Sequence, residues 1–144
     1  LAILFHLAEG TPYLPVDAFE RSKVLQWLSF ENDYLQNSIG SLRFWKLTAM
    51  HRPTELVASK KQVALRCLRI LDEALTSTSF LVGGRYTIAD MACFAYTHLA
   101  DDAGLALRDY PHVLAWIGRV RAQPGFLDKV STYSVDPHSR TELP

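Results

Sequence analysis

Apolar residues recur every three or four positions along most of the chain, and short polar stretches with glycine or proline interrupt them. This spacing places the apolar residues on one face of a helix, whereas a strand would show strict alternation. No alternating stretch is present. The pattern therefore predicts an all-α fold, a bundle of about five helices around a buried central helix. Helices are expected over residues 1–8, 18–38 and 55–75, and two more begin near residues 87 and 109.

The central helix is expected to begin at Thr87, within the stretch 80–96. A threonine hydroxyl at the N-cap accepts a hydrogen bond from a free N–H of the first turn, and an acidic residue three positions later can bond back to the cap. Thr87 and Asp90 have this spacing and predict a capping box. The residues that follow are almost all apolar, as in a helix that is buried on every side. We expect capping to account fully for a buried Asp90.

The first long helix carries two apolar stripes, and Asp17 is expected to cap it. Residues 38–41 either end or kink this helix, and residues 42–47 either leave it or continue it. The expected core face consists of Val24, Leu28, Leu35, Ile39 and Leu42. The second stripe consists of Trp27, Phe30 and Tyr34. Both stripes could lie inside the domain, or one could face a second subunit or a further domain.

Composition narrows the classes of function. The 144 residues are 49% hydrophobic, enough for one domain with a core. Fifteen basic and fifteen acidic residues cancel, so no basic surplus indicates nucleic-acid binding. The apolar stretches are too short and too interrupted by charge to span a bilayer. Cys67 and Cys93 fall on apolar helix positions and are expected to be buried free thiols in a reducing compartment.

No motif in the chain describes a complete active site. Gly83 and Gly84 precede a helix but lack the spacing of a phosphate-binding loop. The five histidines and two cysteines form no cluster, so no metal site is expected. The carboxylate pairs 72–73 and 101–102 are adjacent in sequence, do not share a helix face and are expected at the surface. We therefore assign no catalytic residue to this chain.

Several segments, in this order and spacing, resemble the C-terminal helical domain of bacterial-type cytosolic glutathione transferases. They are residues 26–31 (QWLSFE), 80–90 (FLVGGRYTIAD), 110–111 (YP) and 124–126 (PGF). Residues 1–15 resemble the junction between the two domains of that family. The resemblance implies a remnant helix of an N-terminal thioredoxin-like domain at 1–10, a linker at 11–16, the C-terminal helical domain at 17–130 and an irregular tail at 131–144.

The resemblance implies a cytoplasmic, usually dimeric enzyme of detoxification, with glutathione as co-substrate and no metal. Its N-terminal thioredoxin-like domain would hold the thiol-activating residue, and the C-terminal helices would line a pocket for a small hydrophobic electrophile. This chain alone lacks the glutathione-activating site, so we expect it to be inactive by itself. The alternative is a non-catalytic scaffold of the same fold, as in elongation factor gamma subunits and aminoacyl-tRNA synthetase complexes.

The resemblance implies that the first long helix lines the electrophile pocket. Five residues of that helix are the candidates for contacting the electrophile. They are Asn32, Leu35, Gln36, Ile39 and Arg43. Asn32 and Gln36 could also reach glutathione bound across a dimer. The alternative is that these residues are ordinary surface or core positions.

Overall fold

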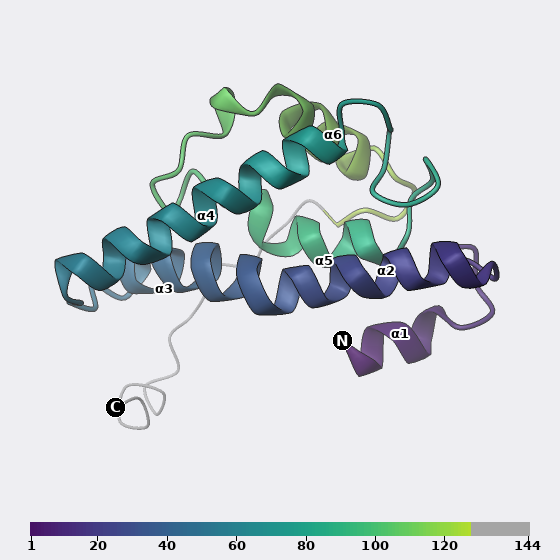
Figure 1. Ribbon diagram of the computed structural model, residues 1–144, viewed down its shortest axis with the longest axis horizontal. Helices are drawn as coiled ribbons and strands as arrows, with labels where there is room; N and C mark the ends of the chain where they lie inside the picture. Colours follow the sequence, from purple (N-terminus) through teal and green to yellow (C-terminus); the bar gives the residue numbers. More distant parts are fainter. Residues whose placement is uncertain (128–144) are drawn as a thin grey trace.

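The computed structural model describes residues 1–127, which form helices joined by turns (Figure 1). The elements are α1 (Ala2–Ala8), α2 (Ala18–Phe30), the π-helix η1 (Glu31–Gly40), α3 (Ser41–Leu47), α4 (Thr54–Ala74), α5 (Ile88–Thr97), the 3₁₀ helix η2 (Leu107–Asp109) and α6 (Pro111–Arg121). Within these residues the only strand-like feature is an isolated bridge between Val82 and Arg85. The predicted all-α fold is confirmed. The irregular tail predicted at 131–144 lies outside the described residues.

The first long helix continues through residues 42–47, which is one of the two alternatives that the sequence left open. Asp17 caps it by accepting a hydrogen bond from the Glu20 backbone at 2.9 Å. From Ala18 to Leu47 the elements α2, η1 and α3 follow one another without a break, and both Gly40 and Ser41 keep right-handed helical backbone angles. The helix therefore does not end at 38–41. A Cβ built at Gly40 would lie 2.9 Å from the Tyr96 ring, so this glycine marks a close approach of α5 rather than a helix end.

Helix α5 lies at the centre, between the long helix and α6, as the apolar run predicted (Figure 1). Ala89 and Cys93 have no exposed surface. On one side, the core joins α5 to η1, α4 and α6. On the other side, a smaller cluster joins the start of α5 to α1 and α2 through Ala8, Leu14 and Val24. Helix α1 is therefore packed onto this domain.

The Asp90 carboxylate connects three segments. Its Oδ2 accepts hydrogen bonds from the Thr87 backbone N–H (3.0 Å) and hydroxyl (3.1 Å), while the Thr87 hydroxyl accepts from the Ala89 backbone at 3.3 Å. Its Oδ1 accepts from the Leu81 backbone and from Trp116 Nε1, both at 2.9 Å. The expectation that capping fully explains Asp90 was therefore wrong, because the residue also holds a connector and α6. Burial raises its pKa, although all four donors act to lower it.

Two carboxylates that were expected to be solvated surface groups also have structural partners. Asp72, on α4, accepts hydrogen bonds from the backbones of His112 (2.8 Å) and Val113 (3.0 Å), and so caps α6 from a neighbouring helix. Asp101 accepts a hydrogen bond from the Leu107 backbone at 3.1 Å. Free N–H groups at a helix start need acceptors, which need not be local in sequence. The sequence could not indicate these pairings because they join residues up to 41 positions apart.

Replacing Asp90 is expected to lower stability more than the loss of a surface cap would. Asp90→Ala leaves the Leu81 N–H and Trp116 Nε1 without their partner in a dry core, so the loss should be roughly 2–4 kcal/mol. Urea unfolding followed by circular dichroism measures it. Asp33→Ala, at an exposed position of η1, serves as the control. If Asp90→Ala and the control unfold at the same midpoint as the parent, the structural role of Asp90 is wrong.

Candidate functional site

A line of three polar side chains and one glycine runs along one side of the long helix. Asn32, Gln36, Gly40 and Arg43 follow one another at intervals of four, four and three residues, a spacing that keeps them on one side of a helix. We call this line the polar stripe. Asn32 and Gln36 are exposed, and Gly40 and Arg43 are half-buried. Three of the five predicted ligand residues therefore lie together on an accessible surface.

The other two predicted ligand residues lie in the core. Leu35 and Ile39 have no exposed surface and belong to the cluster that includes Leu68 and Trp116. They cannot contact a ligand on the polar stripe unless the helix repacks. The core face lies next to the polar stripe on the same helix. Helices α4 and α5 pack against this core face and cover it completely. The ligand role of Asn32, Gln36 and Arg43 stays a prediction.

The polar stripe offers both donors and acceptors. At one end of the stripe, Arg43 Nε lies 3.2 Å from Asp102 Oδ2. At the other end, the Asn32 amide donates to Asp33 Oδ1 at 3.2 Å. The Gln36 side chain makes no hydrogen bond within residues 1–127, so both ends of its amide can bind a ligand.

Glu31 is buried at the junction of α2 and η1. It is only 7% exposed, and its carboxylate has no hydrogen bond or ion pair within the described residues. Burial raises its pKa. The positive N-terminal amine acts to lower this pKa, but burial has the larger effect, so ionising Glu31 destabilises the folded state.

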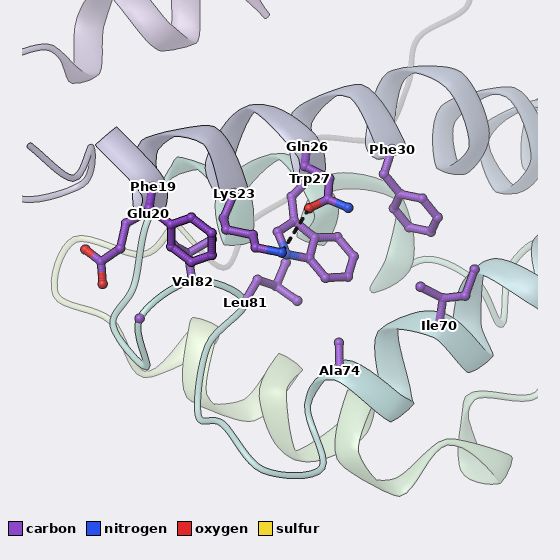
Figure 2. A pocket seen from close by; sticks show the side chains of 11 residues that line it. Phe19, Glu20, Lys23, Gln26, Trp27, Phe30, Ile70, Ala74, Leu81 and Val82 are labelled. Carbon is purple, nitrogen blue, oxygen red and sulfur yellow. Dashed lines mark hydrogen bonds between the residues drawn. The ribbon is translucent and has the colours of Figure 1, made fainter. Parts of the chain in front are cut away.

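An aromatic groove of about 580 Å³ opens on the other side of the long helix (Figure 2). Trp27 and Phe30 from α2 meet edge to face, 5.4 Å apart, and Phe30 continues to Tyr34 at 5.8 Å. The opposite wall consists of Ile70, Ala74 and Leu81. Lys23 and Gln26 lie at the rim, 3.5 Å apart (Figure 2). The stripe of Trp27, Phe30 and Tyr34 was predicted, but its opposite wall was not, because Ile70 and Ala74 lie beside the core face of α4.

Cys67, Cys93 and His98 have structural roles in this domain. Cys67 and Cys93 are free and buried, and burial raises the pKa of both thiols, that of Cys93 strongly. Neither is therefore prepared to act as a thiolate nucleophile. The His98 ring stacks on Phe94 at 4.2 Å, its Nδ1 lies 2.6 Å from the Phe94 carbonyl oxygen, and burial lowers its pKa.

Residues 1–127 hold no group of three or more His, Cys, Asp or Glu side chains that could hold a metal ion. No helix in that part of the chain is long and apolar enough to cross a membrane.

Comparison with known proteins agrees with this architecture. The family model described as "Glutathione S-transferase, C-terminal domain" matches residues 25–124. A solved glutathione S-transferase from Xanthobacter autotrophicus is 40% identical, with a TM-score of 0.84, and the match covers 88% of this chain and 62% of that one. The disulfide-bond oxidoreductase YfcG of Escherichia coli is 29% identical over 85% of this chain and 58% of its own length.

A third relative was solved with ligand. This glutathione transferase from Burkholderia graminis, with two glutathione molecules bound per subunit, is 27% identical, with a TM-score of 0.74, over 85% of this chain and 55% of its own. The chain thus spans little more than half the length of these three relatives.

Glu31→Gln should raise stability at neutral pH. Below the ordinary glutamate pKa of 4.5 the folded and unfolded states both hold the proton, so the charge contributes nothing. As the pH rises through the raised pKa of the folded state, the unfolded chain ionises first, and the wild type loses stability. The glutamine variant lacks this loss, so its advantage is expected at pH 7 and should vanish near pH 4.

Urea unfolding midpoints of both proteins across this pH range measure the effect. Asp33→Asn, which removes a charge at an exposed position of the same helix, is the control. A glutamine variant with the same midpoint as the wild type at pH 7 contradicts the prediction.

Proposed function

The chain belongs to the glutathione S-transferase family, of which it holds the C-terminal domain, and from this we propose that its full-length protein transfers glutathione to small electrophiles. The observation that carries the proposal is the family match over residues 25–124, together with 40% identity to a glutathione S-transferase of the same fold. In this proposal the electrophile binds at the accessible polar stripe of the first long helix.

We propose that α1 is the last helix of a thioredoxin-like domain, that residues 11–16 are the linker, and that the C-terminal domain covers 17–130. The exposure of α1 supports this division, because Ile3 (77%) and Leu7 (70%) are apolar residues left to solvent. A cavity of about 410 Å³ also lies between α1 and α2, lined by Phe5, Leu25 and Leu28 among others. Large exposed apolar patches mark surfaces that another protein part covers.

The division of labour follows from the chemistry. The nucleophile in such a reaction is a thiolate, and an enzyme must stabilise it and hold an electrophile beside it. Cys67 and Cys93 are unsuited to this task, so the reacting thiol is that of glutathione, activated by the other domain. In our proposal Asn32, Gln36 and Arg43 orient the electrophile, and Asn32 and Gln36 also reach glutathione bound across the dimer. Buried free thiols fit a cytoplasmic setting, and the family membership is our ground for proposing a detoxifying role.

We further propose that the protein is a homodimer and that the aromatic groove lies in its interface. Tyr34 is 52% exposed and continues the groove along the same helix. Half-buried aromatic residues beside a groove are typical of interface cores.

Two other activities remain as candidates. A relative's name, disulfide-bond oxidoreductase, favours reduction of disulfides by glutathione as a second chemistry. A scaffold of the same fold would bind no glutathione. An assay of the full-length protein distinguishes disulfide reduction and a scaffold role from glutathione transfer.

The full-length protein should bind immobilised glutathione and conjugate it to chlorodinitrobenzene. Replacing both Asn32 and Gln36 by alanine removes two hydrogen-bonding side chains from the polar stripe and should lower kcat/KM about tenfold. Gln62→Ala, an exposed amide on α4, is the matched control. Reduction of a glutathione mixed disulfide without conjugation would favour the second chemistry. Absence of glutathione binding would instead favour a scaffold.

Phe30→Glu should convert the dimer to a monomer, because it places a charge among the aromatic residues of the groove. Sedimentation velocity of the full-length protein measures the change. Leu56→Glu, at a partly exposed apolar position of α4 away from the groove, should leave the dimer intact. A Phe30→Glu protein that sediments as a dimer would place the interface elsewhere.

A further inference from the structure

Tyr96 of α5 lies directly against the polar stripe. A Cβ built at Gly40 would be 3.1, 2.9 and 3.5 Å from Cδ1, Cε1 and Cζ of the Tyr96 ring. One whole edge of the ring, from near its base to the carbon that bears the hydroxyl, therefore rests on the helix backbone at Gly40. Any residue with a side chain at position 40 would push the ring away.

The place of contact is the middle of the polar stripe. Gly40 lies four residues after Gln36 and three before Arg43, so both side chains are its neighbours on the same side of the helix. The Tyr96 ring thus contacts the stripe at the position between Gln36 and Arg43, and Arg43 pairs with Asp102 beside it. Sequence reasoning did not find this residue, because 53 positions separate Tyr96 from Arg43 (96 minus 43).

The Tyr96 hydroxyl has capacity to bind a ligand. Tyr96 is half-buried, its ring packs against the main core, and its hydroxyl makes no hydrogen bond within residues 1–127. A phenol O–H that reaches a partly dry surface usually finds a partner, and it can donate as well as accept. The ring also provides a rigid apolar surface for an apolar ligand to lie on.

We propose that Tyr96 is a further ligand contact of the polar stripe, and that its phenol O–H donates a hydrogen bond to an acceptor atom on the electrophile rather than on glutathione. The inference rests on the proposed function and specifies its substrate class, namely apolar electrophiles that carry an acceptor such as a nitro or carbonyl oxygen. Gly40 acts as a positioning residue, because it admits the ring.

Two glutathione conjugates that differ in the attached group test this assignment. S-p-nitrobenzylglutathione carries nitro oxygens that can accept a hydrogen bond, whereas S-hexylglutathione carries none on its alkyl group. Isothermal titration of the full-length protein gives the affinity for each. Tyr96→Phe removes only the hydroxyl and should weaken binding of the nitrobenzyl conjugate about fivefold, with the hexyl conjugate unchanged.

Gly40→Ala should produce the same selective loss by displacing the ring, and its melting temperature shows whether it is folded. Tyr110→Phe is the control, because its hydroxyl donates to the Leu65 carbonyl on another face of the domain. Equal affinities of Tyr96→Phe and wild type for the nitrobenzyl conjugate would overturn the inference, and so would an equal loss for both conjugates. A wild-type protein that binds neither conjugate would overturn the proposed function, and this inference with it.

Discussion

The buried carboxylate of Asp90 is the interaction on which the rest of the domain depends. One side chain satisfies the start of α5, the connector at Leu81 and the indole of Trp116 on α6. Desolvating a carboxylate is costly, and only a full set of donors makes its burial tolerable. The same donors can reach it only if α5, the connector and α6 occupy one relative position. The buried Asp90 carboxylate thus fixes the relative position of these segments, and apolar side chains pack between them.

This fixed position of α5 determines what the long helix presents to its surroundings. The core face of the long helix, including Leu35 and Ile39, is covered completely by α4 and α5. Two sides remain accessible, the aromatic groove and the polar stripe, and they differ in chemistry. The groove has aromatic and aliphatic walls with polar side chains at its rim, whereas the stripe carries two amides and a guanidinium paired with Asp102. Both thiols of the chain are buried, so neither accessible side presents a thiol to a ligand.

The sequence predicted best those features that depend on residues close together in the chain. The helix assignments, the core face from Val24 to Leu42 and the start of α5 depend on spacings of three or four residues, which the sequence displays directly. The candidate site was predicted in part. Asn32, Gln36 and Arg43 are accessible, but Leu35 and Ile39 are not, because helical spacing alone does not tell how wide a face its neighbours cover.

By itself, then, the sequence determined the all-α class, the family resemblance and the placement of polar and apolar sides on each helix. Only the tertiary structure decided which polar groups meet across elements: Asp90 with Trp116, Asp72 with the start of α6, and Tyr96 with Gly40. The physical reason is that local hydrogen bonds and helix periodicity act over a few residues of chain. Burial of a carboxylate or the approach of a ring to a glycine depends instead on segments that are distant in sequence and adjacent in space.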